Sequence, residues 1–165
     1  MIEECWRIYK NFEKEDFLVK PSIPILFFGD YDKYFRSEIK VITVGLNPSK
    51  REFPSDEPFL RFPNLKDIYQ ELLAGKHYEE YLWALSNYFR NKPYKGWFNS
   101  FEALLNGLGC SYYNKGGNTA LHTDEPALFT APCCVCKESN WVKEIRPILL
   151  EAFKEWYHVR CKKSM

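Results

Sequence analysis

The hydrophobic and polar positions along the chain predict short strands separated by amphipathic helices. Residues 39–44 are apolar and rich in β-branched side chains, and turn-forming residues follow them directly, which is typical of a buried strand that leads into a loop. Residues 119–123 form a second short strand with a polar carboxyl end, and residues 25–28 are a short strand or an extended segment. Strands with polar carboxyl ends, separated by helices, favour an α/β domain with parallel strands.

Apolar side chains at helical spacing predict several amphipathic helices. A short helix is expected near the N-terminus, where Trp6, Tyr9 and Phe12 share one face, and residues 30–36 form a turn or a short helix. Further helices are predicted over residues 64–75, 77–90, 98–108 and 141–157. Pro147 lies inside the last of these, so that helix must either kink or begin anew near this position.

The length of 165 residues indicates a single domain that covers residues 1–165. The formal net charge is +1, so no global field draws the protein toward nucleic acid, although this leaves room for a local basic patch. No apolar run is long enough to span a bilayer, and the first residues lack the basic and apolar regions of a secretory signal. We therefore expect a cytoplasmic monomer without a membrane partner, whose six cysteines are mostly free thiols.

The loop after the first predicted strand holds the first candidate chemistry. Gly45 lets the backbone turn and approach a ligand, and Pro48 disfavours a helical conformation for Asn47. Asn47 would then lie extended at the mouth of the strand, where its amide can hold a water or a polar substrate edge. The alternative is a simple Asn-Pro-Ser turn in which Ser49 caps a helix.

The residues after this loop combine two cations with an aromatic ring. Lys50 and Arg51 can contact phosphate, and Phe53 can stack on a flat ring. The alternative is a solvated loop that one aromatic side chain anchors to the body of the protein. These residue types alone leave both interpretations open.

A cysteine cluster is the remaining candidate site. Cys133 and Cys136 have the spacing of half a zinc knuckle. A second ligand pair would have to come from scattered cysteines and histidines, none of which shows a paired spacing. We therefore expect ordinary thiols in a loop, with no metal and no cofactor.

Several motifs together carry a resemblance to a known family. Gly45-Leu-Asn-Pro-Ser49 resembles the first motif of the uracil-DNA glycosylase superfamily, a Gly-x-Asn-Pro loop in its mismatch-specific branch. Further motifs follow in the order of a prokaryotic glycosylase-like subgroup: Ser49-x-x-Glu-Phe53, a helical block, Pro93-Tyr-x-x-Trp-Phe98, Ser111-Tyr-Tyr113 and Ala120-Leu-His-Thr-Asp124. The resemblance, from about residue 39 to residue 132, implies a three-layer α/β/α fold around a parallel central sheet. It also implies hydrolysis of the N-glycosidic bond of uracil or another altered base flipped out of DNA.

The resemblance also implies roles for individual residues. Asn47 would position the hydrolytic water, and Asp124 would read the edge of the base. Gly45, Leu46 and Pro48 would line the base pocket. The base would stack on Phe53, and the contacts to nucleic acid would come from Ser49, Lys50 and Arg51.

The sequence departs from the family pattern near its end. The second catalytic loop and the last strands of the family are not found after residue 157, so we expect an incomplete sheet. One alternative is therefore a non-catalytic or degenerate relative that binds nucleic acid or a base-like ligand. Another is an unrelated α/β domain that binds a small molecule, in which the Asn-Pro-Ser segment is only a turn.

Overall fold

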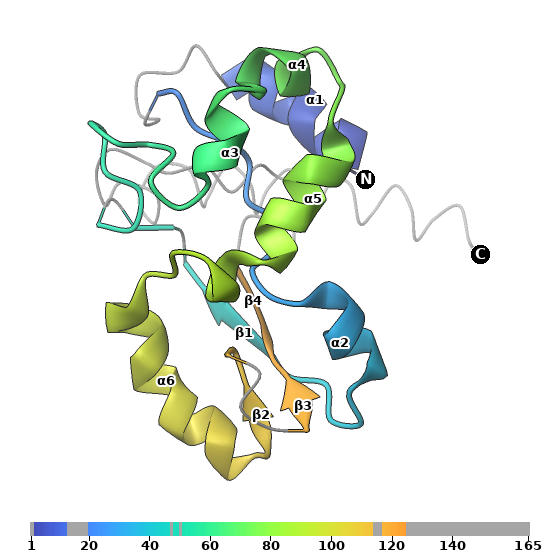
Figure 1. Cartoon of the computed structure of the whole chain (residues 1–165), viewed down its shortest axis with the longest axis vertical. Coiled ribbons are helices and arrows are strands. Elements are labelled where there is room, and N and C mark those ends of the chain that lie inside the picture. The colour runs from blue at the N-terminus through green and yellow to red at the C-terminus, as the bar shows by residue number, and fades with distance from the viewer. Residues whose placement is uncertain (1, 13–19, 47, 50, 114–116, 125–165) are drawn as a thin grey trace, which may run out of the picture.

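The computed structural model describes residues 2–12, 20–46, 48–49, 51–113 and 117–124 (Figure 1). Its elements are α1 Ile2–Phe12, α2 Tyr31–Arg36, β1 Ile42–Gly45, α3 Pro63–Lys66, α4 Tyr69–Leu73, α5 Tyr78–Ser86, the 3₁₀ helix η1 Tyr88–Arg90, α6 Lys95–Gly107, β2 Cys110–Ser111, β3 Asn118–Thr119 and β4 Leu121–Asp124. Within these residues, the fold is a mixture of helices and short parallel strands. No helix among them is long and apolar enough to cross a membrane.

The strands β1 and β4 pair in parallel near the centre of the view in Figure 1. Their register runs from Ile42 opposite Leu121 to Gly45 opposite Asp124. On its other side, β4 forms an antiparallel bridge with Phe28, whose N–H donates to the carbonyl of His122 at 2.7 Å. The predicted parallel pairing of these two segments is confirmed, and it brings both carboxyl ends to one edge.

Side chains of β1 are less buried than the sequence predicts. Ile42 and Val44 are 49% and 52% exposed, although their β-branched side chains indicated a buried strand. Successive side chains of a strand point to opposite faces, so Thr43 turns inward while its neighbours turn outward. The prediction of a strand is therefore confirmed, but the prediction that it is buried is wrong for Ile42 and Val44.

Two predicted helices are each interrupted in the structure. The segment 64–75 divides into α3 and α4, and the segment 77–90 divides into α5 and η1. At the second break, the Asn87 side chain donates to the carbonyl of Trp83 at 2.9 Å, and such side-chain bonds compete with regular helix. The predictions of α1 and α6 are confirmed, whereas the predicted helix over 141–157 lies outside the described residues.

An aromatic cluster forms the core between the helices and the β1–β4 pair. Phe28 is at its centre and stacks on Tyr88, with ring centroids 4.0 Å apart. Further rings pack around Phe28 from separate segments of the chain: Phe53, Phe62, Phe98 and His122. Four helices gather at one end of the strands in Figure 1, namely α1, α3, α4 and α5, while α2 and α6 flank the strands. This packing holds the carboxyl ends of β1 and β4 in place.

Candidate functional site

A cavity of about 360 Å³ lies at the carboxyl ends of β1 and β4. The end of β1 and its loop form one wall: Val44, Gly45, Leu46, Pro48 and Ser49. Aromatic side chains at the start of α6 form another wall: Tyr94, Trp97 and Phe98. Buried polar side chains complete the lining: Glu52, His122 and Asp124. The cavity thus joins flat apolar surfaces to titratable groups, a combination common in ligand sites.

Gly45 makes room for the carboxylate of Asp124. A Cβ added at Gly45 would overlap Oδ1 of Asp124 and would lie 3.2 Å from Cε1 of His122. Gly45 and Asp124 are opposite each other in the β1–β4 register, so a side chain at one position excludes the observed side chain at the other. The sequence suggested a glycine that allows close approach to a ligand, and the structure shows that this glycine makes room for a buried carboxylate.

A hydrogen-bonded chain orients His122 beneath the cavity. Its Nδ1 lies 2.9 Å from Oγ1 of Thr43, which in turn lies 2.5 Å from the hydroxyl of Tyr112. Its Nε2 lies 3.5 Å from Oδ1 of Asp124. Burial raises the pKa of Tyr112 to about 12, so this hydroxyl keeps its proton at neutral pH. The ring of His122 is therefore held between a neutral hydroxyl network and an acidic side chain.

Glu52 is a second buried acidic side chain on the wall of the cavity. Its N–H donates to Oγ of Ser49 at 3.1 Å, and its carbonyl accepts a hydrogen bond of 3.0 Å from Nε of Arg61. The hydroxyl of Tyr88 donates to Oε1 of the carboxyl group. Burial raises the pKa of Glu52 to about 7, against a smaller opposing effect of the Tyr88 hydrogen bond, and the charge of Asp124 adds to the increase.

The structure brings most of the sequence-predicted site residues together. Gly45, Leu46, Pro48, Ser49 and Asp124 all line this cavity. Ser49 caps a turn that contains Glu52. Asn47 and Lys50, which the sequence places in the same loop, lie outside the described residues. Arg51 is exposed and does not line the cavity.

Phe53 does not lie where the sequence suggested a stacking ring. It is 2% exposed and packs in the core, with ring centroids 6.4 Å from Phe28 and 6.0 Å from Phe62. The rings on the cavity wall are those of Trp97 and Tyr94 instead. Phe53 was singled out because its ring follows two cations in the sequence. An aromatic residue that anchors a loop to the core has the same pattern, so the pattern alone does not separate the two.

Sequence reasoning gave no role to Glu52, His122 or Trp97, although all three lie within quoted motifs. The spacing Ser49-x-x-Glu52 is that of a capping box, which would have indicated a local turn at Glu52. Nothing in the sequence indicated that this glutamate would be buried. That burial depends on packing against Tyr88, a residue 36 positions away.

Cys133 and Cys136, which have the spacing of half a zinc knuckle and are expected to be ordinary thiols, lie outside the described residues. Among the described residues, no group of three His, Cys, Asp or Glu side chains has a geometry that could hold a metal ion. Cys5 and Cys110 are buried free thiols, and burial raises the pKa of Cys5 to about 12. Cys5 therefore remains a neutral thiol at physiological pH.

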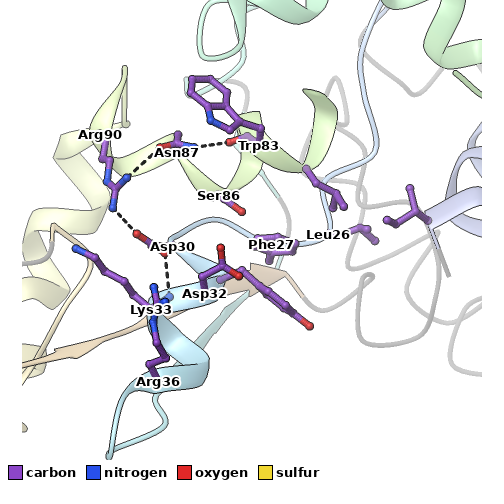
Figure 2. A pocket seen from close by; sticks show the side chains of 13 residues that line it. Leu26, Phe27, Asp30, Asp32, Lys33, Arg36, Trp83, Ser86, Asn87 and Arg90 are labelled. Atoms are coloured by element: carbon purple, nitrogen blue, oxygen red, sulfur yellow. Dashed lines mark hydrogen bonds and ion pairs between the residues drawn. The ribbon is translucent and has the colours of Figure 1, made fainter. Parts of the chain in front are cut away.

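A larger cavity, of about 760 Å³, lies between α2 and α5 (Figure 2). Some of the polar groups along it bond to one another: Arg90 pairs with Asp30 and Asn87, and Asp30 also caps α2 through the N–H of Lys33. Asn87 in turn donates to the carbonyl of Trp83. These side chains serve the local fold, so the smaller cavity with its buried acids is the better candidate.

No family model, curated protein or solved structure matches this chain. The motifs of the sequence and the geometry of the cavity at β1 and β4 are therefore the features that indicate a function.

Proposed function

We propose that this protein is a DNA glycosylase that hydrolyses the N-glycosidic bond of uracil or another altered base flipped out of DNA. The observation that carries the proposal is the position of the motif residues. Gly45, Leu46, Pro48 and Ser49 line one cavity together with Asp124, which comes from a motif about 80 positions later. The resemblance to the uracil-DNA glycosylase superfamily assigns Gly45, Leu46, Pro48 and Asp124 to the base pocket, and Ser49 to the contacts with nucleic acid.

The cavity has the chemistry that such a reaction requires. A flipped base needs a flat apolar surface and polar groups at its edge, and here Trp97 and Asp124 provide them. Asn47, between the wall residues Leu46 and Pro48, would hold the hydrolytic water. The transition state carries positive charge on the sugar, and the acidic side chain of Asp124 would stabilise that charge.

We also propose that the described elements belong to a three-layer α/β/α fold with β1 and β4 as neighbours in its central sheet. Helices on two sides of the β1–β4 pair support this arrangement. In this proposal the protein is a cytoplasmic monomer with DNA as its partner. Sedimentation analysis at several concentrations checks the monomer, and a second species of twice the mass would contradict it.

A cleavage assay tests the proposed activity. Fluorescent oligonucleotides that contain uracil, hypoxanthine or xanthine are incubated with the protein, and abasic sites are then opened with hot alkali. We expect cleavage of at least one substrate, and loss of that cleavage in Asn47→Ala. The matched control is Asn106→Ala, because Asn106 is exposed on α6 and does not line the cavity.

The assay also separates the alternative function. Salt-dependent binding of DNA without cleavage, in a protein with the circular dichroism of a folded chain, would replace the enzyme with a non-catalytic relative that binds nucleic acid. Absence of both cleavage and DNA binding would contradict both nucleic-acid functions.

A further inference from the structure

Glu52 is close enough to the candidate cavity to contact a molecule bound in it. Neither the sequence motifs nor the proposed base pocket gives this residue a role. Its side chain is 6% exposed and lies on the wall of the cavity that contains Asp124. A buried carboxyl group without a cationic side chain bonded to it is rare in a structural role. The only hydrogen bond to its carboxyl group among the described residues comes from Tyr88.

The hydrogen bonds of Tyr88 determine which oxygen of Glu52 carries a proton. The hydroxyl oxygen of Tyr88 accepts a hydrogen bond of 2.9 Å from the N–H of Tyr94. Its single proton is donated to Oε1 of Glu52, so Oε1 is an acceptor. A proton on the carboxyl group is therefore on Oε2, which is left to donate.

The surroundings of Glu52 raise the pKa of its carboxyl group, so that a large share of it is protonated at neutral pH. Burial is the main cause of the raised pKa, which is about 7, and the negative charge of Asp124 on β4 acts in the same direction. Tyr88 and Arg61 act in the opposite direction. His122 is the other titratable group of β4 on this cavity, and its nearest acidic partner is Asp124.

We propose that Glu52 is a catalytic general acid, which donates the proton of Oε2 to the departing base. This inference depends on the proposed glycosylase function. In the step, the bond between the sugar C1′ and the base nitrogen breaks, and its electron pair goes to the base. The O–H bond of Glu52 breaks as the base takes the proton. The oxygen of a water molecule bonds to C1′, and the proton that this water loses restores Glu52 through solvent. The sum is hydrolysis.

A general acid must be protonated to act, so the rate should fall at high pH. We expect the single-turnover rate constant for cleavage of a uracil oligonucleotide to be level below pH 7. It should then decrease by about tenfold for each further pH unit. Glu52→Gln should lower the rate at pH 6 by about 100-fold or more and should abolish this decrease. The amide can still accept from Tyr88, so the variant should fold, which its melting temperature checks.

A better leaving group separates acid catalysis from a structural role. The anion of 5-fluorouracil is more stable than that of uracil, so its departure needs less help from an acid. The loss caused by Glu52→Gln should therefore be at least tenfold smaller on a 5-fluorouracil oligonucleotide than on a uracil one. The control is Glu57→Gln, because Glu57 is exposed and outside this cavity, and its rates should match those of the wild type.

Tyr88 is a positioning residue in this proposal. Its hydrogen bond lowers the pKa of Glu52, so Tyr88→Phe should shift the high-pH decrease of the rate to higher pH. An active wild type with an equal Glu52→Gln loss on both substrates, or a rate that rises above pH 7, would overturn the acid role and leave the glycosylase function intact. A folded wild type that cleaves no substrate would overturn both.

Discussion

The carboxylate of Asp124 lies against the backbone of Gly45, at a point where any Cβ on Gly45 would overlap its Oδ1. Both residues end their strands, and they are opposite each other in the parallel register. The carboxylate of Asp124 therefore occupies the space that a side chain on Gly45 would need.

Gly45→Ala should disrupt the site because the added Cβ would overlap Oδ1 of Asp124, so this buried carboxylate would have to leave its observed position. We expect a loss of about 1–3 kcal/mol in the free energy of unfolding, as for other cases of overpacking. Urea denaturation measures it. Gly107→Ala is the matched control, because no atom lies within 4 Å of its added Cβ and alanine favours helix. Equal stability of Gly45→Ala and the wild type would contradict the contact.

Thr43→Val should destabilise the protein because its hydroxyl joins His122 to Tyr112. Valine keeps the shape but leaves two buried polar groups without this partner, which costs about 1–3 kcal/mol. Thermal unfolding measures the loss, and Thr43→Ser should recover most of it. Wild-type stability in Thr43→Val would contradict this role of the hydroxyl.

Stability should decrease as pH rises because of Glu52. Its folded pKa of about 7 is above the ordinary value of 4.5, so between these values the folded chain holds a proton that the unfolded chain has lost. The contribution of this proton to the free energy of unfolding is therefore fully present below pH 4.5 and is lost as pH rises through 7. Its size is about 3 kcal/mol. Urea denaturation at pH 5 and pH 8 measures the difference, which should shrink in Glu52→Gln. Equal pH dependence in wild type and variant would show that other groups cause it.

Removal of the Phe53 ring should reduce stability, whereas removal of the Trp97 ring should reduce the binding of oligonucleotides. Phe53→Ala removes a core ring and should lower the free energy of unfolding by about 3–5 kcal/mol. Trp97→Leu keeps an apolar side chain at a half-buried position of the cavity wall. It should weaken the binding of oligonucleotides with an altered base by about 1–3 kcal/mol, the size of a lost stacking contact. Fluorescence anisotropy measures this binding, and unchanged binding would exclude Trp97 as the stacking ring.

The sequence by itself predicted the kinds of elements and their order. The apolar, β-branched run at residues 39–44 and the helical spacing at α1 and α6 are local properties, so they needed no knowledge of distant residues. The motif Gly45–Ser49 and the polar end of β4 were also visible as local patterns. Helices between the strands favour parallel pairing. Parallel pairing places the carboxyl ends of both strands at one edge, so the sequence could predict that Gly45 and Asp124 lie near each other.

Only the tertiary structure decided which side chains became buried and what they contact. Phe53 and Glu52 are neighbours in one turn, yet one ring enters the core while the adjacent carboxyl group lines the cavity. The breaks after α3 and α5 were not visible in the sequence, because the helical pattern continues through them. The raised pKa of Glu52 has the same origin. It results from loss of solvent around a carboxyl group enclosed by segments distant in the sequence, which no local pattern encodes.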